Sequence, residues 1–322
     1  MIDNIRKPIK SHMQAFEPYF KQQLQSPDKL LSLVTNYIIR KNGKKMRPML
    51  VFLSALQAGG VSDASKVAAT LIELLHTATL VHDDIVDEAE QRRGQLSVNA
   101  MWNSKLAVLV GDFFLARGLQ IAIENNQIGI LKVVSDAVQE ISEGELLQME
   151  HANKLNIDEN SYYEVIRKKT ATLIAACTKS GAISASAPDD IVSAMYQYGL
   201  NLGIAFQIKD DIFDYHKTSL IGKPTGNDLK ERKITLPLIH ALDVAPVDEK
   251  KTLMYLIKKR YKEDSTFQIA SEFVKRYEGI EYATLKMHEY GQKALNALHS
   301  LPQTEATRSL EDLILYNENR KK

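Results

Sequence analysis

The 322-residue chain carries 41 Lys and Arg against 40 Asp and Glu, a formal net charge of +1 at pH 7. Charge this balanced argues against a protein that binds nucleic acid by phosphate attraction. Hydrophobic residues make up 44% of the chain, enough for a substantial core, and the single cysteine excludes a disulfide framework within the chain, which fits a reducing, cytoplasmic location. The N-terminus lacks the apolar segment of a signal peptide, and no apolar stretch reaches the ~18 residues needed for a transmembrane segment.

Helical periodicity recurs along almost the whole chain, and alternating strand patterns are rare. Helices are expected over 11–39 (broken near 26–28), 49–57 after Pro48, 64–87 after the cap at 62–63, 107–124, 128–151, 161–180 and 189–215. Loops are expected at 94–103 and 216–234, and shorter amphipathic helices over 235–318. Because no linker interrupts this pattern, we predict one all-α domain over 1–322.

An acidic signature, Asp-Asp-x-x-Asp, occurs twice inside apolar helical runs. Three carboxylates on one short apolar stretch are costly to bury unless they are paired or bind cations. Hard oxygen ligands of this kind suit Mg²⁺, which is held by one or two carboxylates, waters and substrate phosphates. The two copies therefore predict metal sites on facing walls of one cavity; their members are Asp83, Asp84 and Asp87 in DDIVD, and Asp210, Asp211 and Asp214 in DDIFD.

Helical spacing extends each signature by a polar residue upstream. His76 shares a stripe with Asp83 and Asp87, at offsets of 0, 7 and 11 residues. Gln207 precedes the second cluster in a similar way. A solvated acidic helix face is the alternative for one such motif, and a satisfied core histidine is the alternative for His76. Two copies followed by basic segments favour the metal interpretation.

Basic residues follow each acidic helix and also gather at one expected helix start. The segment 42–48 places Lys44 and Arg47 at a loop-to-helix junction, where free N–H groups already favour an anion. A solvated basic turn is the alternative for that segment alone. The other cations are Arg92 and Arg93, Lys168 and Lys169 before Thr170, and Lys223 and Lys233. Acidic clusters, cations and apolar helices together indicate Mg²⁺-dependent chemistry on an apolar diphosphate.

These motifs, in this order, closely resemble those of the trans-polyprenyl diphosphate synthases. The matching segments are GKKxRP (43–48), HTATLVHDDIVD (76–87), RRG (92–94), GDF (111–113), GExxQ (144–148), KT (169–170), FQIKDDIFD (206–214), GKPxGxDL (222–229) and KxTLP (233–237). The chain departs from the usual pattern at Asn42 and Lys45, where the family has Gly and Arg. The resemblance implies a helical bundle around a central cavity, the isoprenoid synthase fold, and a homodimer.

The resemblance also implies the reaction. An allylic prenyl diphosphate ionises, the carbocation alkylates isopentenyl diphosphate, and a proton is lost, with Mg²⁺ (or Mn²⁺) held by the six aspartates. Arg92, Lys169 and Lys223 would contact the allylic diphosphate, with Lys233 nearby. Lys44, Arg47, His76 and Arg93 would bind isopentenyl diphosphate, and Phe206 would pack near its apolar group. Thr170 and Gln207 would stabilise the allylic cation. Glu145 and Gln148 have two equal interpretations: they support the site residues, or they have a structural role only.

Small residues upstream of the first motif predict a long product. In a helix, Ala78 and Thr79 lie deeper than Asp83, and in the family bulky aromatics at these positions stop growth early. A long all-trans chain is therefore expected, with a tunnel that continues toward the helix at 107–124 and a floor at Leu115, Leu119 or Ala122. The alternative is that Ala78 packs against a neighbouring helix and another residue caps the tunnel, which would give farnesyl or geranylgeranyl products.

Two other functions compete with chain elongation. A terpene cyclase would share the first motif but would need neither the second nor Lys44 and Arg47. A non-catalytic subunit of a heteromeric synthase should have lost aspartates or cations, and none is missing here. The catalytic subunit of a heteromer remains open, as does transient membrane contact for release of the product.

Overall fold

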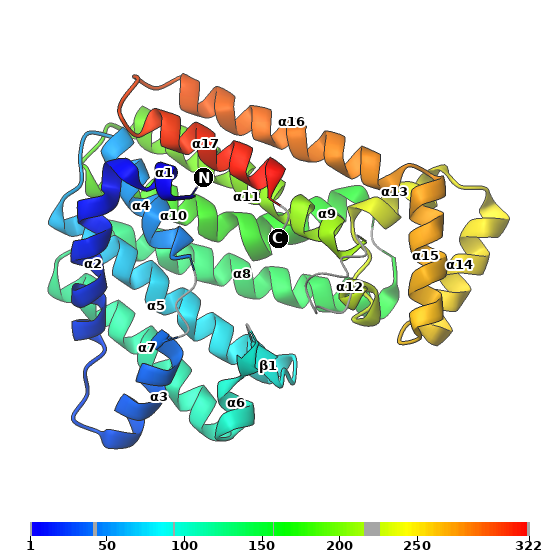
Figure 1. The fold of residues 1–322 in the computed structure, drawn as a ribbon, viewed down its shortest axis with the longest axis horizontal. Coiled ribbons are helices and arrows are strands. Elements are labelled where there is room, and N and C mark those ends of the chain that lie inside the picture. Colours follow the sequence, from blue (N-terminus) through cyan, green and yellow to red (C-terminus); the bar gives the residue numbers. More distant parts are fainter. Residues whose placement is uncertain (1, 41–43, 93, 157, 216–225, 321–322) are drawn as a thin grey trace. The chain divides into compact units, whose positions relative to one another are not determined.

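The computed structural model describes residues 2–40, 44–92, 94–156, 158–215 and 226–320. Most of them lie in helices, and the expected all-α class is confirmed (Figure 1). The helices are α1 (Ile2–Ile5), α2 (Lys10–Gln23), α3 (Lys29–Arg40), α4 (Met46–Gln57), α5 (Asp63–Val86), α6 (Val98–Met101), α7 (Ser104–Glu124), α8 (Ile128–Lys154), α9 (Glu159–Ile166), α10 (Thr172–Ser184), α11 (Asp189–Asp214), α12 (Asn227–Lys230), α13 (Leu236–Val244), α14 (Val247–Arg260), α15 (Asp264–Arg276), α16 (Gly279–His299) and α17 (Thr307–Asn319). A 3₁₀ turn, η1 (Lys7–Ile9), a π-helical segment, η2 (Arg167–Ala171), and two strands, β1 (Gln91–Arg92) and β2 (Gln95–Leu96), complete the elements.

Contacts group the chain into two compact units. Unit 1 comprises Met1–Val138, Ala176–Tyr196 and Leu301–Leu310, and unit 2 comprises Gln139–Ala175, Gln197–Ser300 and Glu311–Lys322. The first acidic motif therefore belongs to unit 1 and the second to unit 2. The single domain expected from the sequence stays a prediction.

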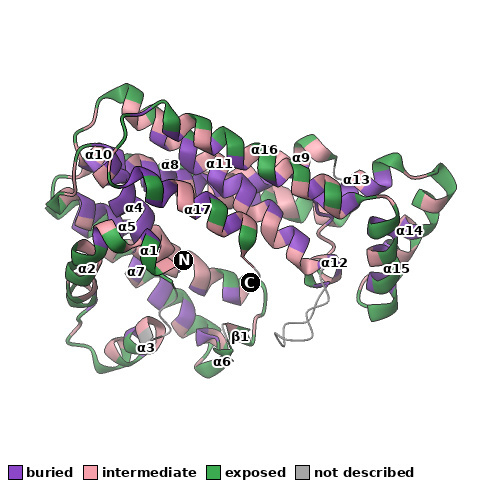
Figure 2. Ribbon diagram, turned by 45° about the horizontal axis from the view of Figure 1, so that its top comes forward, coloured by how far each residue is buried: buried purple, intermediate pink, exposed green. Residues whose placement is uncertain are grey.

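Unit 1 is organised around α5 and α7, which pack side by side (Figure 1). Gly118 of α7 allows this approach, because a Cβ there would lie 3.2 Å from a methyl carbon of Leu71. The α4 helix is buried along most of its length, as Figure 2 shows in purple. Buried apolar helices of this kind read as helical from sequence because their hydrophobic positions recur with the period of the helix.

Serine hydroxyls form the hydrogen bonds that fix the start of α5, at the helix cap expected at 62–63. Ser62 is the N-cap, and its backbone N–H donates to Ser65 Oγ over 3.1 Å. Ser62 Oγ donates to the Ser184 carbonyl over 2.7 Å, and the Ser65 and Ser184 hydroxyls are 2.7 Å apart. These bonds join α5 to the end of α10 within unit 1.

Unit 2 has its own apolar core. Residues of α11, η2, α13, α15 and α16 contribute to it, among them Ile208, Leu236 and Met287, each at most 1% exposed. The α13 helix contacts both α15 and α16, and α14 pairs with α15 (Figure 1). This core holds the segment of α11 that carries the second acidic motif.

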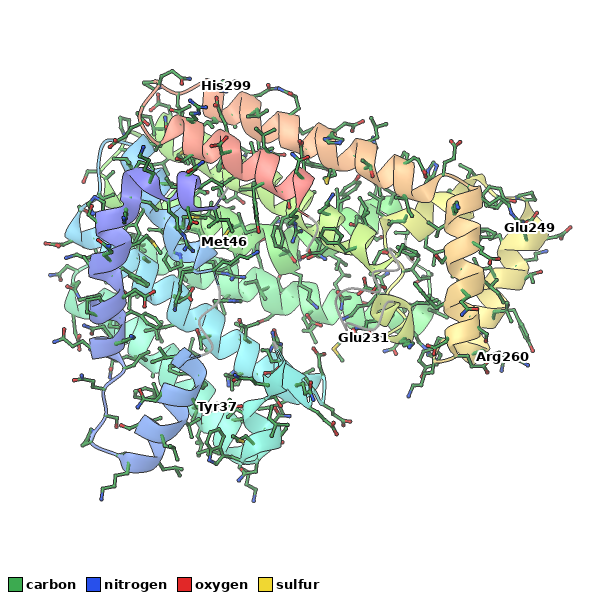
Figure 3. All side chains as sticks on the ribbon, viewed as in Figure 1. Tyr37, Met46, Glu231, Glu249, Arg260 and His299 are labelled. Atoms are coloured by element: carbon green, nitrogen blue, oxygen red, sulfur yellow. The ribbon has the colours of Figure 1, made fainter. Side chains whose placement is uncertain are left out.

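Three predicted elements differ from the structure. The described part of the loop expected at 216–234 contains the short helix α12. The helix expected over 161–180 is three segments, because α9 gives way to the π-helical η2 before α10 begins. The loop expected at 94–103 contains β2, which pairs with β1 as an antiparallel hairpin, and the short helix α6. Tyr37 of α3, labelled in Figure 3, connects this helix to the hairpin and α6. Its hydroxyl donates to the Leu96 carbonyl over 2.8 Å, and its ring packs edge-on against Trp102.

The sequence pattern predicted no apolar stretch of this length, but among the described residues two helices, α5 and α7, are long and apolar enough to cross a membrane by length and composition. In α5, 61% of the most apolar 18-residue window is buried inside the protein, as in a core helix of a globular fold. In α7 the share is 39%, and its outer face exposes Val108, Leu109 and Ile123. An exposed apolar face on a packed helix is typical of a protein interface as well as of a membrane contact.

The hydroxyl network at the start of α5 leads to the first testable prediction. Ser65 is fully buried, so Ser65→Ala should lower the free energy of unfolding by about 1–3 kcal/mol by leaving its partners unsatisfied. Denaturant unfolding measures the change. Ser193→Ala, at an exposed position of α11 in the same unit, should change it by less than about 0.5 kcal/mol. Equal effects of the two changes would show that the network adds nothing.

Candidate active site

The first acidic motif lies where α5 ends. Asp83 and Asp87 are exposed, Asp84 is 3% exposed, and Asp87 is the C-cap residue. The helix period explains the division, because positions 83 and 87 share a face and position 84 lies beside it. The expected common stripe of Asp83 and Asp87 therefore exists, and Asp84 points into the protein.

Asp84 is paired to a basic residue of the hairpin. Arg92 Nε donates to Asp84 Oδ1 over 2.6 Å, and Asn99 Nδ2 donates to the Asp84 carbonyl over 3.2 Å. The β1–β2 hairpin thus brings Arg92 back onto the helix that precedes it. Arg92 was expected to contact the allylic diphosphate. In this structure its Nε is paired with Asp84. Because Nε carries only one of the five N–H donors of the guanidinium, this pair does not use the others.

A cavity of about 90 Å³ in unit 1 lies beside the motif. His76, Asp84 and Arg92 contribute to its lining, and so do Phe20, Leu24, Ile38, Ile39, Lys45, Glu73, Thr77, Leu80, Val81, Ser97, Val98 and Phe114. Lys45 keeps the positive charge expected at its position: Nζ is 3.1 Å from Glu73 Oε1 and 4.5 Å from the centre of the Phe20 ring. His76 is therefore in a mixed polar and apolar cavity with Asp84.

Ala78 and Thr79, the expected chain-length residues, are not among the residues that line this cavity. Ala78 is 3% exposed and lies on the face of α5 between Leu74 and His82, which approach Gly118 and Gly111 of α7. Thr79 Oγ1 donates to the His76 carbonyl over 2.9 Å. Of the expected floor residues on α7, Leu115 is half-buried, Leu119 is 37% exposed and Ala122 is buried.

The expected isopentenyl diphosphate residues are only partly described. Lys44 is exposed and Arg47 half-buried at the start of α4, and the Lys44 carbonyl accepts a hydrogen bond from the Arg6 guanidinium. Lys45, next to Lys44, has the left-handed backbone conformation, with φ of 44°. Arg93 and Lys223 lie outside the described residues.

In unit 2, Asp211 of the second motif is buried and accepts two hydrogen bonds. Tyr162 donates to Oδ2 over 2.6 Å, and Gln207 Nε2 donates to Oδ1 over 2.8 Å. Thr170 Oγ1 in turn donates to Gln207 Oε1 over 2.7 Å. Burial raises the pKa of the Asp211 carboxyl, and the negative charge of Asp228 acts in the same direction.

Asp214 and Asp210 have different environments. Asp214 accepts from the backbone N–H groups of Gly226, Asn227 and Asp228 over 3.1–3.3 Å, so it caps α12. Burial raises its pKa and, together with the charge of Asp214, raises the pKa of Asp228 to about 7. The Asp210 side chain is 41% exposed and pairs with Arg320 over 2.7 Å.

Phe206 lies under the same arginine. The Arg320 guanidinium stands 4.0 Å from the centre of the Phe206 ring and donates to the Phe206 carbonyl over 2.9 Å. Asp210 and Phe206 are one helical turn apart, so this contact defines one face of α11. Gln207, Asp211 and Asp214 occupy the adjacent face.

The π-helical segment η2 carries Lys169 and Thr170. A π-turn widens the helix by one residue and often marks a functional site. Two glycines let neighbouring helices approach it: a Cβ at Gly203 of α11 would lie 2.5 Å from the Ala171 Cα, and one at Gly144 of α8 would lie 2.8 Å from the Lys168 Cβ. Thr170 is thereby brought within hydrogen-bonding distance of Gln207.

Lys169 is held by the polar residues of the GExxQ segment. Its Nζ is 2.5 Å from Glu145 Oε2 and 3.4 Å from Gln148 Oε1. Both residues contact a cation of the expected site, and the choice between a supporting and a plainly structural role for Glu145 and Gln148 stays open.

A cavity of about 210 Å³ in unit 2 joins these residues. Its polar lining comes from α8, α9, η2, α11, α12 and the segment after α12, and comprises Gln148, His151, Tyr162, Lys169, Thr170, Gln207, Asp211, Asp228, Arg232, Lys233 and Thr235. Lys233 forms an ion pair with Glu231, and Arg232 Nε is buried without a hydrogen-bond partner in the described part of the chain. Carboxylates, cations and a buried donor in one cavity fit a metal-bound anionic ligand.

Several contributors were not predicted as site residues. Tyr162, Asp228, Arg232 and Arg320 reach the second motif or its cavity from other segments. Asp228 lies in the quoted GKPxGxDL segment, so it had a sequence signal. Tyr162 and Arg320 had none, since only folding brings α9 and the end of α17 to α11.

Among the described residues, no three His, Cys, Asp or Glu side chains converge closely enough to hold a metal ion by themselves. Cys177 is buried, and burial raises the pKa of its thiol to about 12, which fits the expected packing role.

Comparison with known proteins identifies the family. The polyprenyl synthetase family model matches residues 28–274. The chain belongs to this family. It is 34% identical to an octaprenyl diphosphate synthase of Haemophilus influenzae over 97% of this chain and 95% of that protein. The kinship confirms the expected fold and the expected function, long-chain all-trans prenyl elongation.

Two solved structures are similar over the full chain. A decaprenyl diphosphate synthase from Rhodobacter capsulatus has a TM-score of 0.93 at 35% identity and is covered completely, as is this chain. A polyprenyl synthase from Caulobacter crescentus CB15, complexed with calcium and isoprenyl diphosphate, has a TM-score of 0.92 at 32% identity, with 100% of this chain and 98% of that one covered. The polyprenyl synthase described here therefore shares their all-α isoprenoid synthase fold.

The close approach at Gly203 gives the second prediction. Gly203→Ala places a methyl group against Ala171 of η2, so we expect a loss of about 1–3 kcal/mol in the free energy of unfolding and a fall in turnover as Gln207 separates from Thr170. Thermal unfolding and steady-state kinetics measure both. Gly129→Ala is the matched control, because a Cβ at this helical glycine meets nothing within 4 Å. Full activity and stability of Gly203→Ala would contradict the packing argument.

Proposed function

We propose that this polyprenyl synthase condenses isopentenyl diphosphate with an allylic prenyl diphosphate to give a hepta- to decaprenyl diphosphate. The observation that carries the proposal is the unit 2 cavity, where Lys169, Thr170 and Gln207 lie beside the second aspartate motif. A diphosphate needs cations, and a carbocation needs oxygen dipoles in a site that excludes water. The lining supplies both.

Each residue has a role in the proposed reaction. Lys169 binds the leaving diphosphate, and Glu145 and Gln148 hold the Lys169 side chain in place. Arg92, Lys223 and Lys233 bind the same diphosphate with their positive charges. Thr170 and Gln207 face the allylic cation with oxygen atoms. Lys44, Arg47, His76 and Arg93 bind isopentenyl diphosphate, with Phe206 against its apolar group.

The proposed cofactor is Mg²⁺, with Mn²⁺ as a substitute. When bound, it would neutralise the charge that develops on the departing diphosphate. We propose Asp83, Asp87 and Asp210 as direct ligands, because their side chains are at least partly exposed. Asp84, Asp211 and Asp214 support the site from buried or capped positions. A small number of carboxylate ligands is typical of Mg²⁺, because water and substrate phosphates fill its remaining coordination positions.

Purified protein supplied with isopentenyl and farnesyl diphosphates tests the function. Products of 35–50 carbon atoms, sized after removal of the diphosphate, are the result expected for hepta- to decaprenyl chains. Inactivity of the pure chain that is restored by a second protein would identify it as the catalytic subunit of a heteromer. Products that stop at farnesyl or geranylgeranyl would overturn the long-chain proposal.

We propose a homodimer that forms through the exposed apolar face of α7. Val108 is 41%, Leu109 64% and Ile123 57% exposed on this helix of unit 1. Association removes such apolar area from water, which is the main favourable term in stable homodimers. A cytoplasmic location, with transient membrane contact when the long apolar product is released, completes the proposal.

The third prediction concerns the metal. Activity should disappear in EDTA and return with Mg²⁺ or Mn²⁺. Asp83→Asn and Asp210→Asn should each lower kcat by about 10²-fold or more, because charge on the leaving group loses its counterion. Far-ultraviolet circular dichroism verifies that these variants fold. Undiminished turnover in EDTA would remove the metal from the mechanism.

The fourth prediction concerns product length. Ala78→Phe should shorten the product to the farnesyl or geranylgeranyl range if Ala78 borders the growing chain. The alternative is that Ala78 only packs between α5 and α7, in which case a phenyl ring would separate the two helices. Thermal unfolding together with product analysis distinguishes these two roles. A stable variant with an unchanged product distribution rules out a chain-length role for Ala78.

A further inference from the structure

A chain of hydrogen bonds in unit 2 runs from a buried tyrosine to a hydroxyl on the cavity wall. Tyr162 donates to Asp211 Oδ2, Gln207 Nε2 donates to Asp211 Oδ1, and Thr170 Oγ1 donates to Gln207 Oε1, over 2.6, 2.8 and 2.7 Å. Three elements, α9, α11 and η2, contribute to it. Gln207 and Thr170 line the cavity, and Tyr162 and Asp211 are 2% and 3% exposed.

The donor and acceptor atoms set the direction of every bond. Gln207 Nε2 donates to Asp211 Oδ1, so the NH₂ end of the amide meets Asp211. The amide oxygen then faces Thr170, and the only way for Thr170 to bond with it is to donate its proton. The acceptor lone pairs of Thr170 Oγ1 are consequently left for the cavity.

This direction suits the proposed carbocation. A hydroxyl oxygen whose proton points away presents the negative end of its dipole, which stabilises developing positive charge in a site that excludes water. If the Gln207 amide were reversed, its NH₂ group would donate to Thr170. The Thr170 proton would then be free to turn toward the cation.

Both oxygens of Asp211 are occupied by protein donors within the described chain. These two bonds hold the carboxylate in one orientation and use one lone pair of each oxygen. The neighbouring Asp210 pairs with Arg320 through a side chain that is 41% exposed, whereas Asp211 is buried. The two adjacent aspartates are thus in positions suited to different tasks.

We propose that Asp211, supported by Tyr162, is a positioning residue that orients Gln207 and Thr170 toward the allylic cation and does not bind the metal. The inference rests on the proposed roles of Thr170 and Gln207. Asp211→Asn introduces a donor at this position and permits the reversed Gln207 amide. Tyr162→Phe removes one of the two bonds that hold the carboxylate.

The experiment separates kcat, KM and metal binding. Asp211→Asn should lower kcat by about 10²-fold and Tyr162→Phe by about tenfold, while KM for both substrates stays within twofold. Mn²⁺ binding in the presence of inorganic diphosphate, followed by electron paramagnetic resonance, should also stay within twofold for both variants. Tyr163→Phe is the matched control on the same helix, expected to leave kcat unchanged.

Non-additivity identifies the route of the effect. In a Thr170→Val background, Asp211→Asn should cost clearly less than 10²-fold further, because one of the two groups that it orients is gone. A full 10²-fold loss in that background, or a tenfold weaker Mn²⁺ binding by Asp211→Asn, would overturn the proposal. Thermal unfolding of each variant shows whether a loss reflects folding, and Tyr162→Phe supplies the milder variant if Asp211→Asn is unstable.

Two further results keep this inference distinct from the proposed function. If Asp210→Asn binds Mn²⁺ as tightly as the wild type, the metal assignment of the second motif fails. If Thr170→Val retains full kcat, the cation-stabilising role fails and the positioning role fails with it. If both variants behave as proposed but Asp211→Asn is as active as the wild type, only the positioning role is wrong.

Discussion

The structure depends on how carboxylates are accommodated in apolar helices. A buried carboxylate without partners is strongly unfavourable, and this chain gives each withdrawn aspartate a different partner. Asp84 has the Arg92 guanidinium, Asp211 has a phenol and an amide, and Asp214 has backbone N–H groups. These partners fix the helix ends and so determine which aspartates remain exposed.

The same contacts give the two motifs a common plan. In each motif a buried aspartate anchors the helix end, and at least one aspartate of the same motif is more exposed. The partner of the buried aspartate in the first motif, Arg92, lies in the hairpin after α5, and that in the second motif, Tyr162, lies in α9. Arg92, close to Asp84 in the sequence, and Tyr162, far from Asp211 in the sequence, thus do the same thing: each forms a hydrogen bond with a buried aspartate.

Close backbone contact makes the unit 2 cavity possible. Gly203 and Gly144 bring α11 and α8 against the π-helical segment, so that short side chains such as Thr170 can reach their partners. A hydrogen bond of 2.7 Å tolerates little displacement. Packing in unit 2 therefore sets the orientation of Thr170 and Gln207, the proposed cation-stabilising groups.

The sequence by itself determined the all-α class, most helix boundaries, the two acidic motifs and the family. Those properties follow from local periodicity and from residue types at fixed spacing, which a chain shows without folding. It could not show that 161–180 is interrupted by a π-helix or that 91–96 forms a hairpin, since these depend on packing and pairing. Nor could it separate six similar aspartates into exposed and buried ones, or connect Tyr162 and Arg320 to the second motif. Only the tertiary structure decided these points, because burial and hydrogen bonding depend on side chains that lie far apart in the sequence.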